Sequence, residues 1–404
     1  MADFFQNGVI TTLQELGTRD LARYENELLD FAEERPVALV ISTLYPDLER
    51  AAIGTIIREL ASIGYLTRIV VSLGGADRER YLRALELFKK LPQKVDVIWN
   101  DGERIGEIVE RMQDHRFYLG EPGKGMGAWM AYGLILGDPK IRAIALHDSD
   151  ILSYDRFLLH RLVYPILNPL LDYEFCKGYY ARLGDRLYGR VTRLFFTPLI
   201  RALQKMLGRT PFLVYLDSFR YPLAGEFCMN ADVARVNKIP SNWGLEIGTV
   251  SEVFKNYSTR RVCQVDLGMD YEHRHQGVGV ADSNRGILRM ARETSLSVFH
   301  SLASEGVELG DAFFRTLRAA YSAMAHDAIR QYADLSMING LYYDRDGEES
   351  FVEYFTKTLD RAVLEFSEDS IGSPDLPNWN QVKALMPDVF ERIGGAVKAD
   401  ARSV

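Results

Sequence analysis

Two aspartates, Asp148 and Asp150, directly follow the apolar run 143–146 and are separated by one serine. Such a run predicts a buried strand, so both carboxylates are expected at the exposed end of that strand. There they are able to address one Mg²⁺ or Mn²⁺ ion and, through it, the phosphates of an activated donor. The pair indicates a metal-assisted transferase. A second Asp-x-Asp, formed by Asp344 and Asp346, lies in a less strand-like stretch, so the motif needs support from its surroundings.

A glycine-rich segment around Lys124 precedes a predicted helix at 126–136. Glycine lets backbone N–H groups approach a phosphate or sugar closely, the start of the helix adds partial positive charge, and Lys124 adds a full charge. The GxxxxGK[ST] spacing of a P-loop is absent. The simpler alternative is a turn that only caps the helix.

His273 and Glu246 are two further candidates. An imidazole at His273 is able to complete the coordination of a cation that carboxylates already hold, although two histidines around an arginine also fit a solvated surface loop. Glu246 lies in an apolar, glycine-flanked segment, where an uncompensated charge is costly. It therefore needs either a structural partner or a ligand hydroxyl.

Arg190 and Thr192 stand at the start of a predicted basic helix at 190–207. A guanidinium group and a hydroxyl at the start of a helix suit a carboxylate or a phosphate. The same spacing also fits a capped amphipathic helix whose arginines face solvent, or a helix that lies on a membrane surface.

The 404 residues, 47% of them apolar, are enough to bury a large core. A net charge of -8 argues against nucleic-acid binding, which needs a basic surface. The three cysteines show no CxxC spacing and are expected to be reduced. The first 35 residues lack the apolar segment of a signal peptide, and no stretch reaches the ~20 apolar residues of a transmembrane helix. A cytoplasmic protein without a transmembrane segment is expected.

Strand-like and helix-like patterns alternate between residues 37 and 146, which predicts βαβ units and a mostly parallel sheet with helices on both faces. Ligands of such sheets bind beyond the carboxyl ends of the strands, where the aspartate pair emerges. Strands are predicted at 175–181, 220–229 and 262–267, and helices over most of the chain after 282. We therefore expect an N-terminal helical segment at 1–36, a nucleotide-sugar-binding half at 37–152, an acceptor-binding half at 153–281 and a helical C-terminal extension at 282–404.

Six motifs, taken in their order along the chain, resemble those of the glucosyl-3-phosphoglycerate synthase family. This is a family of retaining GT-A glycosyltransferases with mannosyl-3-phosphoglycerate relatives. They are Gly123-Lys124-Gly125, Asp148-Ser149-Asp150, Gly189-Arg190-Val191-Thr192, Pro222-Leu223-Ala224-Gly225-Glu226, Gly244-Leu245-Glu246-Ile247-Gly248, and Gln264-Val265-Asp266-Leu267-Gly268 followed by Glu272-His273-Arg274. The resemblance implies an α/β fold of the GT-A type, with a Rossmann-like, mostly parallel sheet that binds a nucleotide-diphosphate sugar. It also implies transfer of a hexose, glucose by expectation, to the 2-hydroxyl of D-3-phosphoglycerate.

The same resemblance implies a role for particular residues and suggests a homodimer. Asp150 and His273 are the implied ligands of Mg²⁺ or Mn²⁺, while Asp148 and Glu246 are the implied catalytic residues beside the transferred sugar. The implied donor-binding residues are Thr43, Leu44, Glu49, Ser72, Lys124 and Asp148. The implied acceptor-binding residues are Arg190, Thr192 and His275.

Two departures from the family pattern leave choices open. The loop at 42–49 replaces an Asn-Glu-Glu-like sequence that contacts the nucleotide base, so UDP and GDP both remain candidates. His275 replaces an asparagine near the acceptor, so free glycerate remains an alternative to 3-phosphoglycerate. The sequence does not fix the donor sugar, so mannose remains an alternative to glucose. Two further alternatives come from other classes of protein, namely a sugar nucleotidyltransferase and a non-catalytic binding protein.

Overall fold

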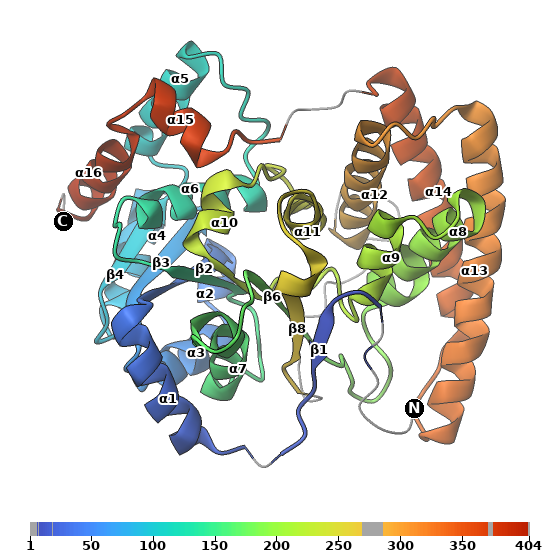
Figure 1. Cartoon of the computed structure of the whole chain (residues 1–404), viewed down its shortest axis with the longest axis horizontal. Helices are drawn as coiled ribbons and strands as arrows, with labels where there is room; N and C mark the ends of the chain where they lie inside the picture. The colour runs from blue at the N-terminus through green and yellow to red at the C-terminus, as the bar shows by residue number, and fades with distance from the viewer. Residues whose placement is uncertain (1–5, 7, 18, 269–285, 371–374, 403–404) are drawn as a thin grey trace.

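A computed structural model describes residue 6 and the ranges 8–17, 19–268, 286–370 and 375–402. In these residues the core is one eight-stranded sheet in the order β1-β8-β6-β7-β5-β2-β3-β4 (Figure 1). All neighbouring strands are parallel except at β7, which runs antiparallel to β5 and β6. The predicted mostly parallel α/β sheet is confirmed. Its strands are β1 (Thr11–Leu13), β2 (Val37–Leu44), β3 (Leu66–Gly74), β4 (Val95–Trp99), β5 (Ala143–Asp148), β6 (Phe175–Tyr179), β7 (Phe227–Asn230) and β8 (Val262–Asp266).

Helices cover both faces of the sheet, so the central strands are apolar on both sides. Side chains alternate along β2: Leu39 and Ile41 face one core, whereas Ala38 and Val40 face the other. The first core is closed by α1 (Leu21–Glu34), α3 (Ala51–Ala61), α4 (Arg78–Phe88) and α7 (Arg156–Leu167). The second is closed by α5 (Glu103–Asp114), α6 (Lys124–Leu136), α10 (Ala231–Val236) and α11 (Leu245–Asn256).

Three details differ from the sequence prediction. The region 47–64 forms two helices, α2 (Tyr45–Leu48) and α3, because the backbone is extended at Arg50. The strand predicted at 220–229 is wrong for residues 220–226, which form turns around Pro222, a residue without an N–H to donate to a strand partner. The strand β1, which pairs with β8 at the edge of the sheet, was not predicted.

The basic helix predicted at 190–207 consists of a π-helical turn, η1 (Val191–Phe196), followed by α8 (Thr197–Leu207). A short helix, α9 (Pro211–Ser218), packs against α8, and a 3-10 turn, η2 (Thr259–Arg261), leads into β8. The start of this segment is not a solvated surface, because Arg193 is buried.

The chain beyond 286 is helical, as predicted, and divides into two groups (Figure 1). Three helices, α12 (Gly286–Ser304), α13 (Asp311–Ile338) and α14 (Arg345–Glu368), pack with α8 and η1. The last two, α15 (Trp379–Leu385) and α16 (Val389–Arg402), return to the other side of the molecule and pack near α5, α6 and β4. Within the described ranges, no helix combines the length and the apolar character needed to span a bilayer.

Candidate active site

Lys124 joins two carboxylates that come from distant parts of the chain. Its Nζ lies 2.8 Å from Oδ1 of Asp148, at the end of β5, and 2.8 Å from Oε1 of Glu246, in the first turn of α11. Burial would lower the pKa of Lys124, but the two carboxylates raise it above the ordinary value. The side chain of Lys124 therefore stays charged and fixes the position of both acids.

The glycines beside Lys124 permit close packing of backbone against backbone. A Cβ atom at Gly125 would lie 1.9 Å from the carbonyl oxygen of Pro240, which no side chain tolerates. The N–H of Met126 donates to the carbonyl of Ser241 at 2.9 Å, so this N–H is not available to a phosphate. The glycine-rich segment thus seats the start of α6 against the chain that leads into α11, and this seating brings Lys124 to Glu246.

Negative charge is concentrated around Asp148. Burial raises the pKa of this carboxyl to about 6; Lys124 opposes the rise, and Glu226 and Asp150 add to it. Glu226, the residue before β7, is fully buried, and its backbone carbonyl accepts a hydrogen bond from Gly178 of β6 at 2.9 Å. Such crowding of acidic groups at the end of a strand is the environment in which a divalent cation is bound most favourably, and oxygen ligands suit Mg²⁺ and Mn²⁺.

Part of the predicted metal site lies outside the described residues. His273 and His275 both fall in the undescribed range 269–285, so their predicted contacts with metal and acceptor stay predictions. Within the described residues, no group of three or more His, Cys, Asp or Glu side chains is arranged to hold a metal ion. Asp150 follows two residues after Asp148, the last residue of β5, and its predicted role as a metal ligand stays a prediction.

Lys177 is a further charged residue of this region that sequence reasoning missed. It is 1% exposed in β6, and its ammonium group donates to the carbonyl oxygen of Ala224. Burial lowers the pKa of Lys177 to about 8, while Glu246 and Glu226 act to raise it. A lysine in the middle of the apolar strand Phe-Cys-Lys-Gly-Tyr was a usable signal, since a buried ammonium group requires nearby acceptors or carboxylates.

Three predicted donor-binding residues, Thr43, Leu44 and Glu49, lie at or just after the end of β2, at the same edge of the sheet as Asp148. In the register of β2 and β5, Ser42 lies opposite Asp148, and the hydroxyl of Thr43 accepts a hydrogen bond from Ser149 at 2.7 Å. Leu44 is 54% exposed, and Glu49 is exposed just beyond it.

Ser72, another predicted donor contact, is enclosed by protein. Its hydroxyl accepts a hydrogen bond from Asn100 at 2.9 Å. A Cβ atom at Gly127 would lie 2.6 Å from the same oxygen, so the first turn of α6 lies directly against it. The hydroxyl of Ser72 therefore has structural partners in this arrangement.

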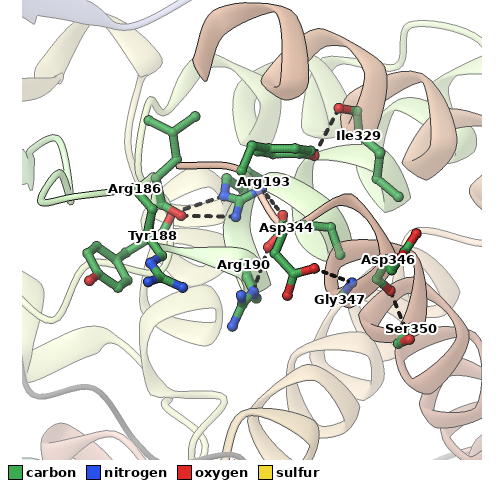
Figure 2. Close-up of polar contacts among 12 residues, drawn as sticks. Arg186, Tyr188, Arg190, Arg193, Ile329, Asp344, Asp346, Gly347 and Ser350 are labelled. Atoms are coloured by element: carbon green, nitrogen blue, oxygen red, sulfur yellow. Dashed lines mark hydrogen bonds and ion pairs between the residues drawn. The ribbon is translucent and has the colours of Figure 1, made fainter. Parts of the chain in front are cut away.

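Arg190 and Thr192 lie where the sheet domain meets the helical extension. The Nε atom of Arg190 lies 2.6 Å from Oε1 of Glu348, a buried carboxylate of α14. Figure 2 shows Arg190 and Arg193 beside the start of α14, where Asp344 and Asp346 lie. The guanidinium group of Arg193 pairs with the other oxygen of Glu348. Thr192 is buried in η1, and its hydroxyl has no hydrogen-bond partner within the described part of the chain.

Aromatic residues connect the Arg190 region with the aspartate pair. The rings of Tyr180 and Tyr221 lie 4.8 Å apart, and a Cβ atom at Gly189 would lie 3.6 Å from the ring of Tyr221. Burial would lower the pKa of Arg182, but the hydrogen bond that its guanidinium group donates to the oxygen of Tyr221 and the charge of Asp150 are among the interactions that raise it. Tyr221 and Arg182 therefore link the segment before Arg190 to Asp150, which follows β5.

A sheet of this topology, with acidic residues at its strand ends, defines a GT-A-type α/β protein, and the solved structures agree. A glucosyl-3-phosphoglycerate synthase from Mycobacterium tuberculosis in complex with phosphoglyceric acid matches with a TM-score of 0.54 at 20% identity, over 75% of this chain and 90% of that chain. Another structure of the enzyme from that organism, in complex with Mn²⁺, UDP-glucose and phosphoglyceric acid, has the same TM-score and covers 74% and 89%.

Sequence comparison identifies the family. Glucosyl-3-phosphoglycerate synthase of Persephonella marina is 46% identical over 99% of both chains. The enzyme of that name from Methanococcoides burtonii is 34% identical over 99% of this chain and 98% of its own. No protein-family model matches the chain. The chain belongs to the glucosyl-3-phosphoglycerate synthase family.

Proposed function

We propose that this protein transfers glucose from UDP-glucose to the 2-hydroxyl of D-3-phosphoglycerate and retains the anomeric configuration. The single observation that carries the proposal is the placement of Lys124, Asp148 and Glu246 as one ion-paired cluster at the carboxyl ends of the strands. The full-length similarity to glucosyl-3-phosphoglycerate synthases supports the choice of reaction. The complexes of the mycobacterial enzyme with UDP-glucose and phosphoglyceric acid support uridine as the base.

For the donor, we assign the half of the chain at 37–152. Thr43, Leu44 and Glu49 would line the nucleotide, and Asp148 would hold hydroxyl groups of the sugar. Asp150, together with His273, would hold Mg²⁺ or Mn²⁺, a role that the oxygen-rich surroundings of Asp150 fit. When bound, the cation supplies electrostatic stabilisation of the leaving diphosphate.

For the chemistry, we favour attack on the same face from which the diphosphate departs. A covalent intermediate needs a free carboxylate nucleophile, but the ammonium group of Lys124 holds both Asp148 and Glu246. A carboxylate in such an ion pair is a weak nucleophile, yet it is well placed to stabilise positive charge on the sugar ring. The departing phosphate oxygen would accept the proton of the acceptor hydroxyl.

For the acceptor, we assign the half at 153–281. The side chain of Arg190 is 27% exposed and is held by Glu348 only at Nε, and Thr192 has a buried hydroxyl without a partner among the described residues. A guanidinium fork and a hydroxyl are groups that bind a phosphate well. This arrangement favours 3-phosphoglycerate over glycerate.

The proposal is tested by a matrix of UDP- and GDP-linked glucose and mannose against 3-phosphoglycerate and glycerate, with divalent metal present or omitted. We expect the highest kcat/KM with UDP-glucose and 3-phosphoglycerate, and turnover only with metal. Absence of nucleoside diphosphate release from every donor would refute a transferase function. Formation of a sugar nucleotide and pyrophosphate from a hexose phosphate and UTP would indicate a nucleotidyltransferase instead.

A further inference from the structure

Glu348 connects the helical extension to the arginines at the start of η1. It lies in α14, is 3% exposed, and is separated from Arg190 by 158 residues of sequence. Each of its two carboxylate oxygens pairs with a different guanidinium group, that of Arg190 or that of Arg193. Burying a carboxylate is costly, and only well-formed partners compensate the cost.

The two arginines have different surroundings. Arg193 is 7% exposed and donates to the carbonyl oxygens of Leu187 at 3.1 Å and Tyr188 at 3.0 Å, so it supports the backbone just before η1. Arg190 uses only its Nε atom for Glu348, and the ring of Phe351 lies 4.3 Å from its guanidinium carbon. Its terminal amino groups have no hydrogen-bond partner in the residues that the structure describes, and its side chain is 27% exposed.

These contacts leave the cluster with unused binding capacity. The two guanidinium groups carry two positive charges and Glu348 carries one negative charge, so one positive charge remains. The edge of Arg190 formed by its two terminal amino groups is one of the two edges of a guanidinium group that bind phosphate or carboxylate with two hydrogen bonds. Glu348 binds the Nε atom of Arg190 and so uses the other edge, which leaves the edge of the two terminal amino groups for an anion.

The extension also holds the loop that leads to Arg190. The N–H of Tyr342, just before α14, donates to the carbonyl of Asp185 at 3.0 Å. The guanidinium group of Arg186 lies 4.7 Å from the centre of the Tyr342 ring. Together with the pair of Glu348 and Arg190, these two contacts from residues 342–348 of the extension hold the loop and the arginine in place.

We propose that Glu348 is a positioning residue of the acceptor site. By holding Arg190 through its Nε atom, it directs the two terminal amino groups toward the phosphate of the acceptor. The helical extension thus completes the acceptor site and is not a separate appendage. This inference rests on the proposed function, and it adds a residue that acts on the acceptor without contacting it.

The test compares the variant Glu348→Gln with Glu349→Gln, a matched control on the next residue of α14 whose side chain is 44% exposed and pairs with Arg345. Glutamine keeps the shape of Glu348 and removes its charge. The KM for 3-phosphoglycerate should rise by about tenfold or more in Glu348→Gln, because a misaligned guanidinium group loses charge-assisted hydrogen bonds. The KM for UDP-glucose should stay within about twofold of the wild type, as should every constant of Glu349→Gln.

An unchanged KM for 3-phosphoglycerate in a folded Glu348→Gln protein would overturn the inference, and so would a lowered KM, which would mean that Glu348 competes with the acceptor. A wild-type protein that transfers no glucose would instead refute the proposed function itself. If Glu348→Gln does not fold, Phe351→Leu takes its place. This variant removes the ring beside Arg190 and should raise the same KM by a smaller factor, while an unchanged KM would again overturn the inference.

Discussion

The ammonium group of Lys124 lies 2.8 Å from the carboxylate of Glu246, although 122 residues separate them in the sequence. The same ammonium group contacts Asp148, so it links the first turn of α6, the end of β5 and the first turn of α11. It is also 5.9 Å from the centre of the Trp243 ring. One lysine therefore sets the relative positions of the two acids that we assign to the transferred sugar.

Replacing Lys124 with methionine should reduce both activity and stability. The change leaves the buried Glu246 and the partly buried Asp148 without their cation, which costs on the order of 3–5 kcal/mol in unfolding free energy. Turnover should fall on the order of a hundredfold or more, because preorganised charges beside the sugar are lost. Urea denaturation and steady-state kinetics measure the two effects.

The double variant Lys124→Met/Glu246→Gln separates these effects. Removing one stranded carboxylate should restore part of the unfolding free energy without restoring turnover. If the double variant is no more stable than Lys124→Met, the pair of Lys124 and Glu246 is not coupled in the way that their distance implies.

Asp150→Ala should abolish metal-dependent turnover and change the unfolding free energy by less than about 1 kcal/mol, because a ligand at a strand end contributes little packing. The control is Asp346→Ala, which alters the other Asp-x-Asp of the chain, at the exposed start of α14. Titrating Mn²⁺ into each protein by calorimetry measures the loss. Equal Mn²⁺ affinity in Asp150→Ala and the wild type would remove Asp150 from the metal site.

Lys177 should make the stability of the protein depend on pH in a predictable direction. Its pKa is about 8 in the folded state, because of burial, against an ordinary value of 10.5. Below pH 8 both states carry the proton, and the folded state bears the full cost of the buried charge. Between about pH 8 and pH 10.5, Lys177 keeps its proton in the unfolded chain but loses it in the folded chain, so the unfolding free energy rises with pH.

The variant Lys177→Met isolates this contribution. Between about pH 8 and about pH 9.5, the wild-type unfolding free energy should rise relative to that of the variant by up to about 1.4 kcal/mol per pH unit. Urea denaturation of both proteins over that range gives the difference. Parallel pH profiles for wild type and variant would mean that Lys177 keeps an ordinary pKa in the fold.

Gly225→Ala should impair catalysis through a single methyl group. The added carbon would lie 2.5 Å from Oδ2 of Asp148 and 3.1 Å from Nζ of Lys124, so one of these groups must move. We expect kcat to fall by on the order of tenfold or more, since small displacements of catalytic groups are costly. Gly106→Ala is the matched control, because nothing lies within 4 Å of its added carbon and alanine favours the helix α5. Equal kcat in both variants would contradict the arrangement.

Local patterns in the sequence were sufficient for part of the structure. The alternation of apolar strands and amphipathic helices predicted the parallel sheet, and the strand-end rule placed Asp148 at its edge. Lys124 and Asp148 could be expected in one cleft, because Lys124 lies at the start of a helix and Asp148 at the end of a strand at that edge. The spacing of apolar residues and the positions of turn-forming residues are local properties, so they can be recognised in the sequence without knowledge of the fold.

The remaining features depend on tertiary packing. The pairing of Glu348 with Arg190 and Arg193 requires knowing that α14 packs on η1, and no local pattern in the sequence encodes that contact. Basic spacing alone suggested that Arg193 faces solvent, yet the extension buries it. The close packing of Gly125 on Pro240 is likewise invisible to a reading that assigns glycines to phosphate binding.

The measurement that tests the central claim most directly is proton NMR of the product formed from UDP-glucose and 3-phosphoglycerate with Mg²⁺, beside a reaction without metal. The account predicts UDP and a new α-linked glucosyl group on the 2-hydroxyl of 3-phosphoglycerate, formed only with metal. A β-linked product, or a product that forms equally well without metal, would contradict it.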